Sequence, residues 1–187
     1  MKTAISFLLT AIALSAQEPA GTAKAPTHPE SYWMEGLWQG YAGEWTHVTR
    51  QVIALAEATP AEKFTWRPEP GVRTFSEVYM HIAMANFYLL SVTGPKLPPG
   101  MKQDMEKTVT DKAQVIDWLT RSFEAVKVER AKLKHEDFGK ALKLRETPVT
   151  VDGMYTRIIV HANEHMGQLI AYARSAGITP PWSKASE

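Results

Sequence analysis

Three histidines have the residue type and the spacing to hold one metal ion. His161 and His165 are four residues apart in a segment with helical periodicity. Because an α-helix turns about 100° per residue, four steps bring the second side chain to within roughly 40° of the first. Both imidazoles therefore leave the same face, and imidazole is the commonest metal ligand in proteins. Two ordinary helix histidines can have this spacing, so a site requires a third ligand.

His81 is the candidate third ligand. It falls on the inner stripe of another helical pattern, with Val78 and Ala85. A lone histidine on an apolar face is more often a hydrogen-bonded core residue, but helical bundles build metal sites where inward faces of different helices meet. Three protein ligands leave one position open for water or substrate, as in catalytic zinc sites. We therefore predict one divalent metal ion held by His81, His161 and His165.

Four helical patterns must position these histidines. Apolar residues recur in them at three- and four-residue steps. The second pattern begins at the capping box Thr74-Phe75-Ser76-Glu77, and the fourth ends before Gly177, which suits the position after a helix. The four helices are expected at about 32–57, 74–92, 110–133 and 151–175.

The connections between these helices favour a bundle. About fifteen residues, with Pro95, Pro98 and Pro99, separate the second and third helices, enough to cross the end of a bundle. Residues 135–147 are polar and irregular, with room for a short turn or strand-like piece. No segment shows the alternating polarity of a strand. The sequence thus predicts an all-α four-helix bundle with a long connection between the second and third helices.

The N-terminus has the layout of a secretory signal peptide. Lys2 supplies a positive charge, an apolar run too short for a mature membrane span follows, and Ser15 and Ala16 are small. We expect cleavage after Ala16, or alternatively after Ser15, and export to the periplasm or the medium. An uncleaved N-terminal anchor is the competing interpretation.

The remaining chain divides simply. We expect a flexible linker at 17–30, one domain at 31–182 and a tail at 183–187, with residues 178–182 lying back across the bundle. Composition, 44% apolar and 22% charged, is that of an ordinary globular protein. No later segment is apolar enough to cross a membrane, and an exposed face of the first helix could support a homodimer.

Charge and cysteine content exclude several functions. Removing residues 1–16 deletes Lys2 and no acidic residue, so the 21 basic and 20 acidic side chains of the full sequence become equal in number. A balanced chain lacks the electrostatic footprint of a nucleic-acid-binding protein. Without cysteine there is no disulfide, thiolate ligand or thiol nucleophile. Any metal must be held by histidine and carboxylate.

Three stretches resemble the DinB / YfiT-like superfamily of bacterial four-helix-bundle metalloenzymes. They have the family's type and order: WRP at 66–68 with Gly71, TFSE at 74–77 leading to HIA at 81–83, and HANEHMGQL at 161–169. The resemblance implies an up-down-down-up bundle and a divalent metal, often zinc or nickel, on the residues matching His81, His161 and His165. Iron and manganese also suit three histidines.

Three functions are compatible with this resemblance. The first is a metal-dependent hydrolase or transferase of unknown substrate, in which the ion polarises a substrate oxygen or activates water. The second is a non-catalytic bundle that binds a metal or a small molecule, including an apolar ligand. The third, implied by some relatives, is a thiol-dependent S-transferase. Export weakens this third reading because the low-molecular-weight thiols concerned are kept in the cytosol.

Residues beside the triad have competing interpretations. Glu164 matches the HxxEH pattern of one metalloprotease class, but we expect a surface or interhelix ion pair, with a base or a ligand-supporting acceptor as the alternative. Gln168 could hydrogen-bond a ligand or fix a histidine tautomer. Gly167 is expected to allow close helix approach. Tyr88 and Tyr172 are expected to be core aromatics.

Other histidines and tryptophans are assigned lesser roles. His47, flanking the core stripe of the first helix, is a possible fourth ligand or pocket residue. His28 and His135 are expected to be solvated. Trp33 and Trp38 could line the mouth of an apolar pocket.

Overall fold

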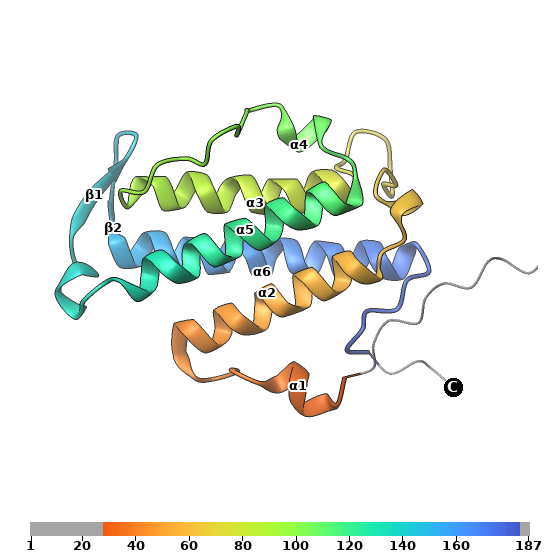
Figure 1. The fold of residues 1–187 in the computed structure, drawn as a ribbon, viewed down its shortest axis with the longest axis horizontal. Helices are drawn as coiled ribbons and strands as arrows, with labels where there is room; N and C mark the ends of the chain where they lie inside the picture. The colour runs from red at the N-terminus through yellow and green to blue at the C-terminus, as the bar shows by residue number, and fades with distance from the viewer. Residues whose placement is uncertain (1–27, 184–187) are drawn as a thin grey trace, which may run out of the picture.

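The computed structural model describes residues 28–183, which are mostly helical (Figure 1). The predicted signal peptide and the linker up to residue 27 lie outside the described residues, as do residues 184–187. No helix in the described part is long and apolar enough to cross a membrane. The helices are α1 (Glu30–Met34), α2 (Gly40–Ala58), α3 (Phe75–Val92), α4 (Met105–Thr108), α5 (Lys112–Ala131) and α6 (Val151–Ser175), with 3₁₀ turns at Ala61–Lys63 and His135–Asp137.

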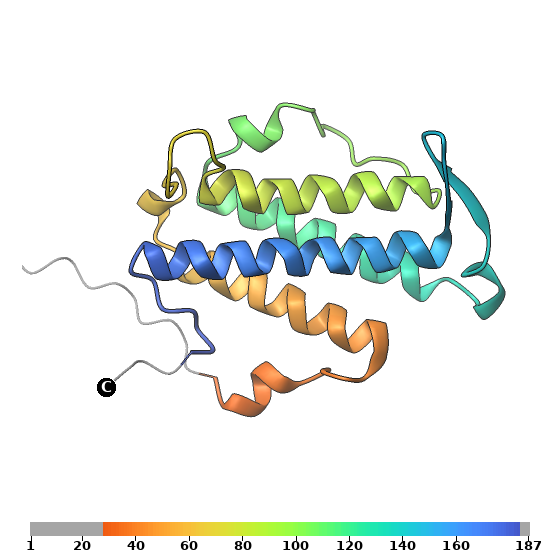
Figure 2. The same cartoon turned by 180° about the vertical axis from the view of Figure 1, so that it is seen from behind.

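Four long helices enclose one hydrophobic core. α3 packs against α5 and α6, and α2 packs against the same two helices. Seen from behind, α6 lies between α3 and α2 (Figure 2). The side chains of Tyr79, Phe64 and Tyr155 are among the largest that the core buries. The prediction of a predominantly helical domain is confirmed.

Capping residues and a glycine define where the two helices that carry the histidines begin and end. Thr74 Oγ1 accepts from the Glu77 amide, and Glu77 Oε2 accepts from the Thr74 amide at 2.6 Å, so the predicted capping box is present. At α6, Thr150 Oγ1 accepts from the Gly153 amide at 3.0 Å. Gly177, just beyond α6, has φ of +77°, the left-handed conformation that glycine adopts without strain.

The prediction of one continuous helix over 32–57 is wrong. The chain forms α1, leaves the helical path after Met34, and re-enters it at Gly40. Gly36 and Trp38, between the two helices, have positive φ, which the interior of a right-handed helix cannot accommodate. Gly40, where α2 begins, also has positive φ. The backbones of Gly36 and Gly43 approach so closely that a Cβ on either would clash. The glycines thus fold this segment into a tight loop.

The all-α prediction is also incomplete, because the described residues include a small β-hairpin. Strands β1 (Ala141–Leu144) and β2 (Thr147–Thr150) pair antiparallel, with Leu142 opposite Val149. Leu142 and Leu144 alternate with exposed residues and pack against the core. The 3₁₀ turn at His135–Asp137 and β1 lie within residues 135–147, where a short turn or strand-like piece was expected. The pairing with β2 was not expected.

Two connections lie against the bundle. Residues 93–111, the connection between α3 and α5, contain α4 and run beside α3 (Figure 1). The segment after α6 returns across the bundle as expected: Ile178 packs on the core, and the ring of Trp182 lies 5.7 Å from that of Trp33.

Candidate metal centre

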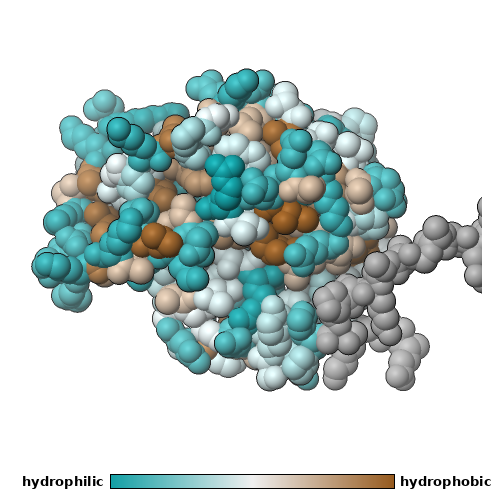
Figure 3. Space-filling view, viewed as in Figure 1, coloured by the Kyte–Doolittle hydropathy of each residue, from teal (hydrophilic) through white to brown (hydrophobic). Residues whose placement is uncertain are grey.

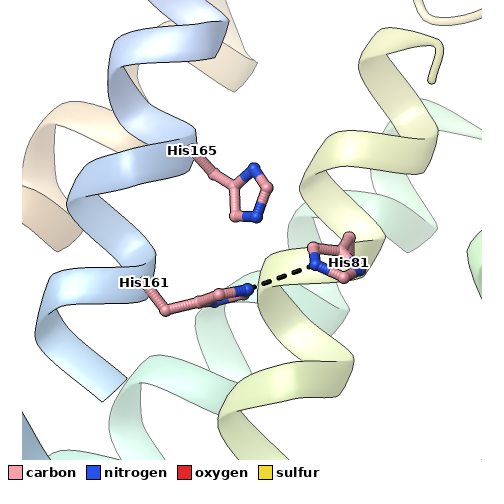
Figure 4. Close-up of side chains that lie close together, drawn as sticks. All are labelled: His81, His161 and His165. Carbon is pink, nitrogen blue, oxygen red and sulfur yellow. Dashed lines mark hydrogen bonds between the residues drawn. The ribbon is translucent and has the colours of Figure 1, made fainter. Parts of the chain in front are cut away.

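The structure brings the three candidate ligands together. One ring nitrogen from each of His81, His161 and His165 lies within 4.8 Å of the other two. His81 extends from α3, and the other two extend from successive turns of α6 (Figure 4). The His165 ring stands nearly perpendicular to both partners, with centroids 4.7 Å and 4.5 Å away. Their convergence is observed, and their role as metal ligands stays a prediction.

The cluster lies at the rim of the bundle rather than in its centre. His161 is buried, His165 is half-buried, and the His81 side chain is 26% exposed. Tyr88, expected on the inner stripe of α3, is 43% exposed, so that expectation is wrong. The stripe through His81 and Tyr88 borders solvent. The cluster is therefore in partial contact with solvent through His81.

Hydrogen bonds on the far side of the His81 ring set its tautomer. Its Nδ1 lies 2.8 Å from Glu106 Oε2 and 3.3 Å from an Arg73 guanidinium nitrogen. A carboxylate only accepts and a guanidinium only donates, so one Nδ1 cannot serve both. The shorter contact, to a charged acceptor, is the stronger one. Nδ1 therefore carries a proton, and Nε2 faces the other histidines, 3.2 Å from His161 Nε2.

His165 is oriented by its own helix. Its Nδ1 donates to Gln168 Oε1 at 2.8 Å, and Gln168 Nε2 donates to the hydroxyl of Tyr172 at 3.0 Å. This contact matches the expectation that Gln168 fixes a histidine tautomer. Tyr172 is 8% exposed, in the core as expected. The Nε2 of His165 is left free for a ligand role.

The donor set fits a divalent cation. His161 Nε2 lies 3.2 Å from His81 Nε2, and two nitrogen ligands of a tetrahedral zinc ion are about 3.3 Å apart. Burial, followed by the charges of the other two histidines and Arg157, lowers the pKa of His161 to about 4. Burial also lowers the pKa of His165, although the hydrogen bond that its ring donates to Gln168 acts in the opposite direction. Both rings are thus neutral near pH 7, as ligands must be.

Glu106 and Arg73 are site residues that the sequence did not reveal. Arg73 Nε donates to Glu106 Oε1 at 2.6 Å, while His81 holds the other carboxylate oxygen. Burial raises the pKa of Glu106, but the hydrogen bonds and charges of Arg73 and His81 outweigh it and lower the pKa overall. An acidic residue in a long connection is the only sequence signal. Asp104 and Asp111 share that signal, so the sequence cannot select Glu106.

Two neighbours on α6 do not contribute to the cluster. Glu164 forms an ion pair with Arg157, at 3.2 Å and 2.5 Å, and both side chains are exposed. The expectation of a surface ion pair is confirmed. No atom of another element lies within 4 Å of where a Cβ on Gly167 would be, so the expectation of close helix approach there is wrong.

The remaining histidines lie elsewhere. His135 is exposed, as expected. His47 on α2 is outside the cluster, and its Nδ1 is buried without a hydrogen-bond partner, so a fourth-ligand role is not supported. His28 is exposed but stacks on Tyr32 with ring centroids 4.1 Å apart.

A cavity of about 880 Å³ lies away from the histidine cluster, between α1, α2, α5 and the segment after α6. Trp33 lines it, as expected, but Trp38 does not and is 82% exposed.

On the face with α5 toward the viewer, hydrophilic residues dominate and apolar ones form small separate patches (Figure 3).

Comparison with known proteins gives a family and a fold. A model of the DinB superfamily matches residues 44–169, the region that contains all three histidines. Among solved structures, a DinB-like protein from Bacillus cereus ATCC 10987 is similar, with 23% sequence identity and a TM-score of 0.65. The similarity covers 80% of this chain and 97% of that chain. No curated protein matches the chain.

Proposed function

The chain belongs to the DinB superfamily, and from this premise we propose that it binds one divalent metal ion through His81, His161 and His165. We propose further that it acts on a small molecule as a metal-dependent hydrolase or transferase. One observation carries the proposal: a ring nitrogen from each histidine lies within 4.8 Å of the others. The lowered pKa values of His161 and His165 and the partial exposure of the His81 side chain support it.

Each histidine has a definite part in this proposal. His81 and His165 would present Nε2, because Glu106 and Gln168 occupy their Nδ1 atoms. Buried His161 would supply the third nitrogen. When bound, a divalent cation supplies Lewis-acid chemistry, polarising a substrate oxygen or lowering the pKa of water. Zinc or nickel is the expected ion, with iron or manganese as alternatives, because all four accept imidazole nitrogen.

We also propose the up-down-down-up order of the four long helices. Tyr41 near the start of α2 meets Arg130 near the end of α5, 3.9 Å from ring centroid to guanidinium carbon. The same tyrosine packs against Tyr155 near the start of α6. Phe75 at the start of α3 packs against Tyr172 near the end of α6. These contacts support α2 and α6 running one way, and α3 and α5 the other.

Export is part of the proposal and rests on residues 1–16 alone. Their positive start, apolar run and small residues are typical of a cleaved signal peptide. Mass spectrometry of the protein from its native host tests this. A mature chain beginning at Gln17 or Ala16, outside the cytoplasm, is expected, whereas an intact N-terminus on cytoplasmic protein would contradict export.

Metal analysis of the purified protein beside two variants tests the function. His161→Ala removes the most buried ring. His135→Ala is the matched control because His135 is exposed and is not part of the cluster. We expect one metal equivalent in wild type and in His135→Ala, and far less in His161→Ala. Equal metal in wild type and His161→Ala, or none in wild type, would contradict the proposal.

Catalysis needs a separate comparison. Chelator should abolish turnover of a substrate found by screening but leave the helical circular dichroism unchanged, because the core does not depend on the ion. Metal binding without turnover of any hydrolase or transferase substrate would favour a non-catalytic binding protein.

A further inference from the structure

The three histidines differ in what holds them. His165 is held by Gln168 on its own helix, whereas the buried Nδ1 of His161 has no hydrogen-bond partner. His81 alone bonds to a charged group, and that group lies 25 residues away along the chain. The connection between α3 and α5 is thus part of the site, although sequence gives no reason to place it there.

The Glu106 carboxylate accepts one hydrogen bond on each of its two oxygens. His81 Nδ1 donates to Oε2 at 2.8 Å, and Arg73 Nε donates to Oε1 at 2.6 Å. Each carboxylate oxygen therefore has its own donor. Both bonds are charge-assisted, which makes them shorter and stronger than neutral ones. The carboxylate cannot turn without losing both.

The segment that carries Glu106 is anchored on the bundle. α4 packs beside α3, and Met105 and Val109 on either side of Glu106 pack against the core. The Glu106 side chain is 23% exposed. The packing of Met105 and Val109 therefore fixes the backbone at Glu106, and the hydrogen bonds from Arg73 and His81 fix its carboxylate.

We propose that Glu106 is the positioning residue for His81. It keeps the His81 proton on Nδ1 and so directs the Nε2 lone pair at His161 and His165, while Arg73 holds the carboxylate in place. The effect on metal affinity rests on the proposed function, but the effect on the His81 tautomer does not. Hydrogen bonds of this kind to ligating histidines fix ring orientation and raise ligand basicity.

Nitrogen NMR of the histidine side chains tests the tautomer directly in chelator-treated protein. Wild type is compared with Glu106→Ala and Glu106→Gln, and with Asp104→Asn as the matched control. Asp104 is an exposed acid on the same segment whose side chain makes no capping bond. We expect Nδ1–H on His81 in wild type and Asp104→Asn, and loss of that tautomer in Glu106→Ala. Glu106→Gln should retain it, because the amide oxygen still accepts. An Nδ1–H tautomer unchanged in Glu106→Ala would overturn the proposal.

Zinc affinity, measured by competition with a chromophoric chelator, tests the consequence. We expect Glu106→Ala to weaken binding by about 10- to 100-fold, Glu106→Gln by less, and Asp104→Asn not at all. A folded Glu106→Ala that binds zinc as tightly as Asp104→Asn would overturn this inference and leave the proposed function standing. Wild type that binds none of zinc, nickel, iron and manganese would instead contradict the proposed function, and the tautomer result would still decide the role of Glu106.

Discussion

Acid should destabilise the protein through His161, and the sign follows from its environment. Burial and the neighbouring charges lower its pKa from 6.5 to about 4. As the pH falls below 6.5, the His161 imidazole binds a proton in the unfolded chain but stays unprotonated in the folded protein. The free energy of unfolding therefore falls between pH 6.5 and about 4 and is insensitive to this group outside that window.

The size of the effect follows from the number of protons. One proton bound in the unfolded state and not in the folded state changes the free energy of unfolding by about 1.4 kcal/mol per pH unit. That slope is the upper limit for His161 in the middle of the window. His165, whose pKa is also lowered, acts in the same direction.

Urea denaturation from pH 7.5 to 4, with chelator present, measures this slope. Carboxylates with lowered pKa values, such as Glu106, also lose stability in acid, so the informative quantity is the difference between wild type and His161→Gln. We expect the variant to lose less stability between pH 6.5 and 4. His135→Gln, at an exposed site, should follow wild type. Parallel curves for wild type and His161→Gln would refute the buried, neutral state of His161.

Three further substitutions have defined outcomes. Gln168→Ala removes the acceptor that holds His165 and should weaken metal binding by about 10-fold in a chelator competition. Glu164→Ala should leave metal content and any turnover unchanged, since its ion pair is exposed; a loss of turnover at full metal content would instead make it a base. Thr74→Ala should lower the free energy of unfolding in urea by about 1–2 kcal/mol. The loss should exceed that of Thr150→Ala, because Thr74 is buried and Thr150 is exposed; the reverse order would contradict this.

Much of the fold could be predicted because its signals are local. The bounds of α6 match those expected, since Thr150 caps one end and Gly177 follows the other. The capping box at Thr74 likewise marks the start of α3. The break before α2 escaped prediction because its apolar periodicity runs on through Leu37 and Tyr41. The turn there depends on the close approach of the Gly36 and Gly43 backbones and on the positive φ of Gly36 and Trp38, which the periodicity does not reveal.

The three histidines of the candidate site could be predicted from the sequence, but Glu106 could not. The spacing of His161 and His165 follows from helix geometry, and His81 follows from the packing of helix faces. Glu106 depends on where a 19-residue irregular connection, residues 93–111, lies on the bundle, and no periodicity encodes that. The rim position of the cluster was also hidden, because the stripe through His81 passes from buried Val78 to exposed Tyr88.

Anomalous X-ray diffraction from crystals grown with zinc tests the central claim most directly. We predict one anomalous peak between α3 and α6, at about 2.0–2.1 Å from a nitrogen of each of His81, His161 and His165. No peak among these rings, or a peak in bonding distance of only one of them, would contradict a shared three-histidine metal site.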